Sequence, residues 1–392
     1  MKIVHLIPTG ILTDGFAYQD NLLTKYHIKM GYEVTAITNE YIYNQGIIAK
    51  DTRMDYYNED GVHVIRLKIK GDKPFNYKFK KYPELYKTLE KEKPDFLFIH
   101  GPCFVDLKII KKYLKRNKNV IAYLDNHCDK SNSGKGFISY NILHKIVWKH
   151  YAQLIEPYIK KFYGVMPSRV EWLQEVYGLP KEKCELLIMG ADDELVQKYN
   201  NDESIREVRK KLSIGRDDIV IVTGGKIDLA KKQTLLLMRT INNIKNKKIK
   251  LCIFGSVVDE LKDEFNKLCN NENIIYLGWI SNQEAYKYMS IADLIVFPGR
   301  HSVYWEIAVA LGKPMICKYW YGTTHIDIGN NVTFLYEDSA DDINKTLLPI
   351  INNKSILEKM KRGANKQKKN DFLYSSIAKK SLDSIEKEDD NL

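Results

Sequence analysis

Residues 298–314, PGRHSVYWEIAVALGKP, decide the fold of the second half of this chain. They follow the apolar run LIVF at 294–297, which is typical of a buried strand. Pro298 and Gly299 interrupt the strand pattern, and a helical pattern follows. The stretch therefore predicts a strand, a tight turn and a short helix, the unit from which doubly wound α/β sheets are built.

The first turn of this predicted helix is rich in groups that attract anions. It carries four polar side chains: Arg300, His301, Ser302 and Glu306. Backbone N–H groups at a helix N-terminus lack helical partners, and the helix dipole adds partial positive charge there. A diphosphate is the natural guest, with Arg300 adding a formal charge. We expect Ser302 to be the N-cap and Gly312 to end the helix, while an ordinary strand-to-helix turn is the alternative.

A second segment rich in glycine and lysine lies upstream, VIVTGGKIDLAKKQ at residues 220–233. An apolar strand runs into Gly224 and Gly225, Lys226 follows at once, and a helical stretch begins at Lys231. Glycines let the backbone approach a ligand, and lysines at this spacing can surround phosphate oxygens. No Gly-Lys-Ser/Thr follows the glycines, so the segment is not a Walker loop and nucleoside triphosphate hydrolysis is disfavoured.

Together these segments resemble the donor-binding domain of a GT-B glycosyltransferase, most closely glycosyltransferase family 4 and its relatives. The family's Gly-Arg-Leu-type turn, with a lysine six residues after the glycine, corresponds to Gly225, Lys226 and Lys231, where lysine replaces the arginine. A strand ending at Gly255 and the run IIYLGW at 274–279 follow in the family's order. The resemblance covers nearly the whole chain.

The chain departs from the family pattern at its glutamates. The family usually carries two glutamates separated by seven residues, but Pro298 occupies the first place and only Glu306 is present. The resemblance implies that Glu306 bonds the nucleotide ribose, so the turn at 300–302 is expected to contact the donor sugar. An exposed Glu306 that only favours the helix dipole is the alternative.

The first half alternates strands and helices in the same way. Residues 2–8 predict a strand, residues 20–30 a helix and residues 33–38 a second strand. The glycines of the first loop, Gly10 and Gly15, are too far apart for a dinucleotide fingerprint. We therefore expect no nicotinamide or flavin cofactor.

Two further apolar strands, 94–101 and 119–125, end in polar residues at the edge where open parallel sheets bind ligands. Asp125 ends the second strand and His127 follows it, whereas His100 joins them only because its strand should end there. The resemblance implies that His127 faces the donor sugar or acceptor. A plain Asx-rich turn is one alternative. A metal site is another, but no cysteine pair or second histidine lies at ligand spacing nearby, and the resemblance implies no metal.

The length of 392 residues predicts two domains. The expected fold is α/β with GT-B architecture, two Rossmann-like doubly wound domains and an interdomain cleft. We place an acceptor-binding domain at 1–190, a nucleotide-sugar-binding domain at 191–370, and a crossover helix and tail at 371–392. The final acidic residues are expected to be disordered.

Composition indicates where the protein resides and which kinds of partner it binds. Six scattered cysteines suggest reduced thiols in a cytoplasm, and we find neither a signal peptide nor a membrane-spanning run. The net charge is +11, and in the basic segment 66–82 Lys78, Lys80 and Lys81 surround Phe79. This segment could lie against anionic lipid at the inner face of a membrane. The charge is diffuse, so nucleic acid is not an expected partner.

The sequence predicts a cytoplasmic glycosyltransferase of the hexosyltransferase type that moves a sugar from a nucleotide diphosphate donor, of the UDP class, to a glycan or lipid-linked acceptor. The nucleotide sugar is a co-substrate, and no further cofactor is expected. The residues expected to bind it are Gly224, Gly225, Lys226, Lys231, Gly255, Arg300, His301, Ser302 and Glu306. The residues expected to act in the chemistry are His127, Asp125, Lys231 and Glu306. The resemblance implies retention of anomeric configuration; a non-catalytic partner subunit and a GT-B sugar-nucleotide epimerase are the alternatives.

Overall fold

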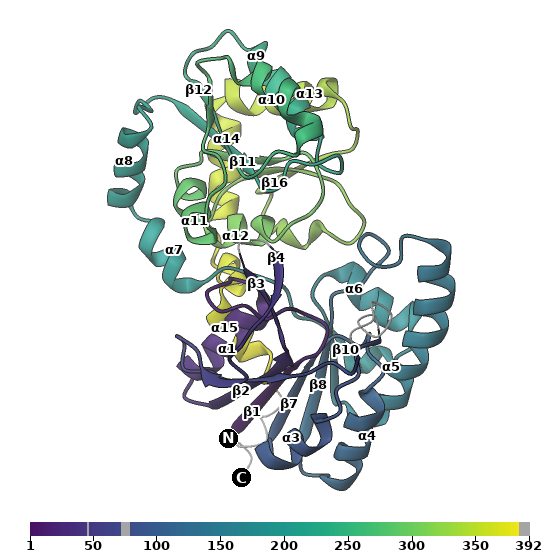
Figure 1. The fold of residues 1–392 in the computed structure, drawn as a ribbon. Coiled ribbons are helices and arrows are strands. Elements are labelled where there is room, and N and C mark those ends of the chain that lie inside the picture. The colour runs from purple at the N-terminus through teal and green to yellow at the C-terminus, as the bar shows by residue number, and fades with distance from the viewer. Residues whose placement is uncertain (45–46, 72–78, 384–392) are drawn as a thin grey trace. The chain divides into compact units, whose positions relative to one another are not determined.

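The computed structural model describes residues 1–44, 47–71 and 79–383 (Figure 1). The chain forms two compact units: unit 1 is Met1–Ile188 with the segment from Ile377 onward, and unit 2 is Met189–Ser376. The chain therefore leaves unit 1 after Ile188, close to the joint expected after residue 190, and returns to it at Ile377. Lys78 and the acidic C-terminal tail lie outside the described residues.

Unit 1 is built on an eight-stranded sheet in the order β10-β9-β8-β7-β1-β2-β6-β5. All neighbouring strands are parallel except β5 and β6, which are antiparallel. The strands are β1 (Lys2–Ile7), β2 (Glu33–Asn39), β5 (Asp55–Tyr57), β6 (His63–Leu67), β7 (Phe96–His100), β8 (Ile121–Asn126), β9 (Lys161–Gly164) and β10 (Cys184–Leu186). A separate antiparallel hairpin joins β3 (Tyr41–Asn44) and β4 (Ile47–Lys50).

Helices cover this sheet and bury its apolar side chains. Helix α1 (Gln19–Lys29) packs on β1 and β2, whereas α3 (Leu85–Glu92), α4 (Leu107–Arg116) and α5 (Lys149–Ile155) lie side by side and share one core with the strands. The other helical segments are η1 (Ile138–Trp148), η2 (Glu156–Tyr158), α6 (Pro167–Glu171), η3 (Trp172–Val176), η4 (Lys181–Lys183) and α15 (Tyr374–Lys380). The last of these carries the chain back into unit 1.

Unit 2 is a six-stranded sheet, β13-β12-β11-β14-β15-β16, in which every neighbouring pair is parallel. Its strands are β11 (Ile219–Gly224), β12 (Ile249–Phe254), β13 (Ile274–Tyr276), β14 (Leu294–Phe297), β15 (Met315–Lys318) and β16 (Val332–Leu335). Its helices are α7 (Asp193–Tyr199), α8 (Asp202–Lys211), α9 (Gln233–Asn242), α10 (Asp259–Cys269), α11 (Asn282–Ser290), α12 (Tyr304–Ala310), η5 (Thr324–Ile326), α13 (Ala340–Asn352), α14 (Lys354–Ala364) and η6 (Gln367–Phe372). The strands are apolar because helices cover both faces of the sheet, as in doubly wound folds.

Both sheets reverse their strand order beside their first strand. In unit 1 the chain builds β2 on one side of β1 and β7 on the other. In unit 2 it builds β12 on one side of β11 and β14 on the other. Such switch points, at the carboxyl ends of the strands, are where open α/β sheets bind ligands. The predicted α/β class with two Rossmann-like sheets is confirmed.

All six cysteines lie in the described part of the chain and carry free thiols. Among the described helices, none combines the length and the apolar character needed to cross a bilayer.

Gly255 gives a test of how closely the ends of β11 and β12 must approach. Its φ is +118°, and a Cβ atom there would lie 2.0 Å from the carbonyl oxygen of Gly225. We expect Gly255→Ala to lower the free energy of unfolding by roughly 2 to 4 kcal/mol, the sum of left-handed strain and a backbone clash, in urea denaturation. Gly278→Ala is the matched control, because its φ is +71° but no atom lies within 4 Å. Equal losses in the two variants would contradict the clash.

Candidate functional site

The two predicted loops of unit 2 meet at the switch point of its sheet. Strand β11 ends at Gly224 and its neighbour β14 ends at Phe297, so the loops after them share one edge. Lys231 lies between them: a Cβ atom built on Gly225 would lie 3.5 Å from Nζ of Lys231, and one built on Gly299 would lie 3.4 Å from its Cγ. The fold thus brings both glycine turns around one lysine side chain.

The surroundings of this lysine are electropositive. Lys231 is half-buried, whereas Lys226 and Arg300 are exposed. Burial lowers the pKa of Lys231, the carboxylate of Asp228 raises it, and the nearby positive charge of Arg300 lowers it further. Because like charges disfavour one another, an anion beside Lys231 and Arg300 would stabilise both cations.

Gly224 and Gly255 have packing reasons to be glycine. A Cβ atom on Gly224 would lie 2.4 Å from the ring of Phe254, and one on Gly255 would strike the backbone of Gly225. Gly225 itself has φ of +108°. These three glycines let β11 and β12 end close together, and their contact with a ligand stays a prediction.

The helix after β14 starts later than the sequence predicted. Helix α12 has seven residues and begins at Tyr304, and its N-cap is Val303 without a side-chain cap. The expectations that Ser302 is the N-cap and that the residues from Arg300 to Ser302 belong to the first turn are therefore wrong. The backbone bends before the helix because the carbonyl of Ser302 accepts from the N–H of Trp305 at 2.9 Å. An anion at this loop would meet side chains and the turn rather than a long helix dipole.

Glu306 is the most constrained charge of this group. Its side chain is fully buried, and Oε1 accepts from Nε2 of His301 at 2.8 Å and from Nε2 of His325 at 3.0 Å. Burial alone would raise the pKa of Glu306, but the charges and hydrogen bonds of His301 and His325 lower it to about 2. The alternative of an exposed Glu306 is wrong. Its Oε2 has no hydrogen-bond partner among the described residues.

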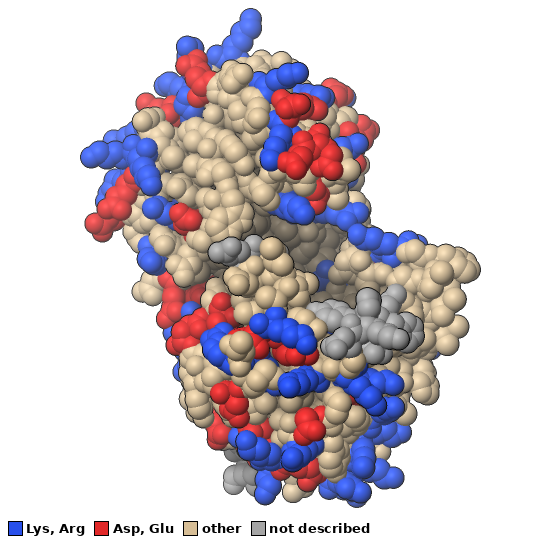
Figure 2. Space-filling view, viewed as in Figure 1, with Lys and Arg blue, Asp and Glu red and all other residues tan. Residues whose placement is uncertain are grey.

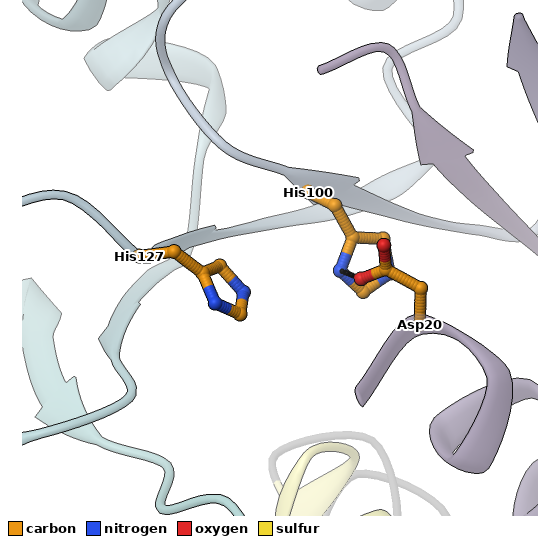
Figure 3. A group of neighbouring side chains, drawn as sticks. All are labelled: Asp20, His100 and His127. Atoms are coloured by element: carbon orange, nitrogen blue, oxygen red, sulfur yellow. Dashed lines mark ion pairs between the residues drawn. The ribbon is translucent and has the colours of Figure 1, made fainter. Parts of the chain in front are cut away.

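The predicted residues of unit 1 form a second charged group, of which Figure 3 shows His100 and His127 together with Asp20. Oδ2 of the buried Asp125 lies 2.9 Å from Nδ1 of His100 and 3.3 Å from Nε2 of His127. Asp20, from the first turn of α1, reaches Nδ1 of His100 at 3.1 Å. Burial would raise the pKa of Asp125, yet His100 and then His127 hold it well below its usual range.

Asp129 belongs to the Asx turn that the sequence offered as an alternative. Its Oδ1 accepts from the backbone N–H groups of Ser131 at 2.8 Å and Asn132 at 3.2 Å. Its Oδ2 pairs with Arg169 at 3.1 Å. The turn explanation therefore fits Asp129, whereas Asp125 serves the two histidines.

Among the described residues, two groups bring potential ligand atoms within 4.8 Å of one another: Asp20 with His100 and His127, and His301 with Glu306 and His325. The sequence showed no second histidine near His127, because His100 arrives from the neighbouring strand. In both groups each histidine already shares a hydrogen bond with a carboxylate. We therefore describe them as hydrogen-bonded networks, and the absence of a metal stays a prediction.

Sequence reasoning missed Asp20 and His325, which lie far along the chain from their partners. It also passed over His5 and His27. His5 had a signal, since it is the one polar residue within the apolar strand pattern of residues 3–7. A polar ring in such a strand needs buried partners. Where those partners lie depends on the fold.

The fold defines the class of this protein as GT-B. It resembles the sucrose-phosphate synthase of Thermosynechococcus elongatus over 100% of both chains, with a TM-score of 0.68 at 13% identity. It also resembles HepE of Anabaena, solved in complex with UDP, over 99% of this chain and 100% of that one, with a TM-score of 0.69 at 12% identity. At these identities the likeness concerns the fold.

Sequence comparison finds a family match for part of unit 2. Residues 204–367 match the model described as "Glycosyl transferases group 1". A curated relative, "Uncharacterized 41.2 kDa protein in cps region" of Klebsiella pneumoniae, is 25% identical over 185 residues, 47% of this chain. The matched part spans about half of that relative, 46% of its length. The fold and the matched segment both agree with the predicted resemblance to GT-B glycosyltransferases; membership of family 4 in particular stays a prediction.

The buried carboxylate of unit 2 should make stability depend on acid. A carboxyl group whose pKa falls from 4.5 to about 2 on folding stabilises the protein above pH 4.5, and this contribution is lost as pH falls to about 2. We expect the stability advantage of the wild type over Glu306→Gln to shrink between these pH values, by on the order of 1.4 kcal/mol per pH unit. Urea unfolding at several pH values measures it. The exposed Glu260→Gln is the control, and parallel pH curves for wild type and Glu306→Gln would contradict the assignment.

Proposed function

We propose that this protein transfers a sugar from a nucleotide diphosphate donor of the UDP class to a glycan or lipid-linked acceptor, without a metal at the diphosphate. The observation that carries the proposal is the convergence of Gly225, Lys231 and the Gly299–Arg300 turn at one switch point. This switch point lies within the segment matched by the glycosyltransferase family model. The UDP bound to HepE, a protein of the same fold, supports the nucleotide class.

The donor diphosphate would lie beside Lys231 and Arg300. Negative charge develops on the diphosphate as the bond to the sugar breaks, and cations already in place stabilise that charge without reorganisation. Lys231 is well suited, because it is half-buried and held between two glycine turns. Exposed Lys226 would contribute at longer range. This arrangement supplies the stabilisation for which other enzymes use a metal ion.

Glu306 would hold the nucleotide through its ribose. Two histidines keep it ionised, and its Oε2 lacks a partner among the residues that the structure describes. A ribose hydroxyl donating to Oε2 would satisfy that buried oxygen. His301 and Ser302, in the loop before α12, would then face the sugar.

Unit 1 would supply the groups that meet the acceptor. His127 is 38% exposed and is backed by the ionised Asp125. We propose that His127 positions the sugar or the acceptor hydroxyl. The carboxylate of the unit 2 group is that of Glu306. Because Glu306 accepts hydrogen bonds from both His301 and His325, it is a poor nucleophile. Retention of configuration would therefore proceed by same-face attack, with the leaving phosphate oxygen taking the acceptor proton.

A membrane-held acceptor is favoured by one exposed apolar face in unit 1. Phe137 is 78% exposed, and Ile138, Ile142 and Ile146 recur at every fourth position of η1 with 65%, 45% and 62% exposure. Exposed Lys135 and Lys145 flank this face. Apolar side chains bordered by lysines fit an anionic bilayer surface. We propose that this face docks the protein at the inner side of a membrane.

The face of the described residues seen in Figure 2 shows no basic stripe. On the surface seen in Figure 2, Lys and Arg side chains are interspersed with Asp and Glu. A nucleic-acid partner would call for a basic stripe. The lipid surface therefore remains the partner that we propose.

Isothermal titration of the protein with UDP, GDP, CMP and dTDP, without metal, followed by hydrolysis and transfer assays on the matching sugar donors, tests the function. We expect selective binding of UDP and release of UDP from a UDP-sugar. UDP binding with no turnover on any donor would instead favour a non-catalytic partner subunit. Interconversion of two UDP-sugars without release of UDP would favour an epimerase.

Paired substitutions separate the donor side from the acceptor side. Lys231→Ala should weaken UDP binding by roughly 10- to 100-fold, because a lysine–phosphate contact is charge-assisted and contributes about 1.5 to 3 kcal/mol. His127→Ala should leave UDP affinity within about twofold and lower the rate of transfer. Titration calorimetry and initial rates measure the two effects. Exposed Lys232→Ala is the matched control, and unchanged affinity in Lys231→Ala would remove that lysine from the site.

The membrane proposal is tested by cosedimentation with vesicles of phosphatidylcholine with and without phosphatidylglycerol. The double variant Ile142→Ser/Ile146→Ser should bind anionic vesicles at least about tenfold more weakly, since two isoleucines lose their burial in lipid. Ile356→Ser, on an exposed isoleucine of α14, is the control. Equal binding by both variants would exclude this face of η1.

A further inference from the structure

Three buried histidines form a hydrogen-bonded row beneath the charged group of unit 1. Nδ1 of His5, in β1, lies 2.9 Å from Nε2 of His100, and Nε2 of His5 lies 2.9 Å from Nδ1 of His27, in α1. His5 and His27 are fully buried and His100 is nearly so. The row runs from the carboxyl end of β7 through β1 to the helix on its far side.

The far end of the row decides which nitrogens carry protons. Nε2 of His27 lies 2.9 Å from Oγ of Ser381 and 3.3 Å from the carbonyl oxygen of Ala378. The hydroxyl of Ser381 donates to that same carbonyl at 2.7 Å. Oγ and the carbonyl then both face His27 as acceptors, so its Nε2 must carry a proton. If the hydroxyl of Ser381 instead donated to an unprotonated Nε2 of His27, the carbonyl of Ala378 would receive a hydrogen bond from neither group.

The proton on Nε2 of His27 fixes the direction of each hydrogen bond along the row as far as His100. A neutral histidine has one donor and one acceptor nitrogen, so Nδ1 of His27 accepts from Nε2–H of His5, and Nδ1 of His5 accepts from Nε2–H of His100. Nδ1 of His100 faces Oδ2 of Asp125 at 2.9 Å and Oδ1 of Asp20 at 3.1 Å, and it too must carry a proton. His100 is therefore an imidazolium held between two carboxylates.

We infer that His5 and His27 are positioning residues for the proposed transfer: by holding His100 as the imidazolium, they keep Asp125 ionised and oriented to accept Nε2–H of His127. Burial opposes the charge of His127 and Asp125 raises its pKa; in the neutral form that donates Nε2–H to Asp125, Nδ1 of His127 is the acceptor nitrogen, on a side chain that is 38% exposed. The inference rests on the proposed function, in which His127 acts on the sugar or acceptor. It adds two residues that no substrate touches.

Electrostatics agrees with this placement of the proton. Although burial opposes the charge, Asp125 and then Asp20 raise the pKa of His100. Burial lowers the pKa of His5 well below its usual value and that of His27 to about 4. The single positive charge of the row therefore rests on His100, next to the carboxylates.

Packing alone does not explain the row. The neighbours of His5 in β1 are apolar and buried, Ile3, Val4, Leu6 and Ile7. A polar ring among them costs free energy unless both of its nitrogens are bonded. Three such rings in line connect the C-terminal segment of the chain to Asp125, and an apolar core would break that connection.

Nitrogen-15 NMR of histidine side chains in the full-length protein tests the assignment directly. At pH 7 we expect His100 to be protonated on both nitrogens, His5 and His27 to carry their protons on Nε2, and the neutral form of His127 to carry its proton on Nε2. A neutral His100, or His5 protonated on Nδ1, would overturn the inference. So would saturable binding of Zn²⁺ that removes the Nδ1–H signal of His100, because the group would then be a metal site.

Two substitutions at His27 separate proton placement from packing. His27→Phe fills the space but offers no acceptor, so the proton of His5 should move to Nδ1 and His100 should become neutral. His27→Asn retains an oxygen that can accept from His5, and it should keep the wild-type pattern. If His100 lost its charge in both variants, or in neither, the inference that His27 sets the protonation of His100 would be wrong.

The same variants link the row to transfer. His27→Phe should lower kcat by roughly 10-fold or more, as loss of an orienting partner does at other functional histidines, with UDP affinity within about twofold. His27→Asn should recover kcat to within about threefold of the wild type. Equal kcat in wild type and His27→Phe would overturn the positioning role.

A failure of the proposed function can be told apart from a failure of the row. If the wild type transfers no sugar, the transfer proposal fails, but the tautomer of His127 remains measurable. The row then predicts Nε2–H in the wild type and in His27→Asn, and a tautomer mixture in His27→Phe. An unchanged His127 spectrum in His27→Phe would overturn the inference without any activity measurement.

Discussion

The reversal of strand order beside β1 and beside β11 is the constraint on which both candidate groups depend. In a parallel sheet every strand-to-helix loop emerges at the same edge. Where the order reverses, the two loops that follow neighbouring strands leave in opposite directions and do not cover that edge. In unit 2 this places Gly225 and Gly299 on either side of Lys231. In unit 1 it places His100 beside the end of β1.

Each of the two groups contains a buried carboxylate held by two histidines. Glu306 accepts from His301 and His325, and Asp125 accepts from His100 and His127. A buried charge is costly unless it is paired and hydrogen-bonded, so the histidines are needed for the carboxylates to stay ionised. One oxygen of each carboxylate, Oε2 of Glu306 and Oδ1 of Asp125, lacks a partner among the described residues. The groups are thus fixed in place without being fully satisfied, which is typical of sites that receive a ligand.

The positive charge on His100 depends on a residue that it does not contact, Ser381. The hydroxyl of Ser381, in the segment that returns from unit 2, determines the proton on His27, and through His5 the proton on His100. The return of the C-terminal segment therefore does more than close the core of unit 1. It completes a hydrogen-bonded line that ends at Asp125.

Much of the fold could be predicted from local patterns. The apolar run 294–297 and the strand ending at Gly224 appear where the sequence places them, because a strand covered on both faces is apolar throughout. The helix boundary at Tyr304 could not be predicted, because the hydrogen bond between Ser302 and Trp305 competes with capping by the hydroxyl. Of the predicted site, Lys231 does lie at the switch point of unit 2, in the loop after β11, and Asp125 lies near the end of β8, bonded to His100 at the end of β7.

The sequence by itself determined the α/β class, the two domains and the loops that carry the lysines, arginine and histidine, because these depend on patterns within some twenty residues. Only the tertiary structure decided the partners: Asp20 and Asp125 for His100, His325 for Glu306, and the row of His5 and His27. Those pairs join strands and helices that are far apart in sequence, with His5 and His100 separated by 95 residues. Hydrogen bonds act over about 3 Å, so no pattern along the chain records them until the sheet sets its strand order.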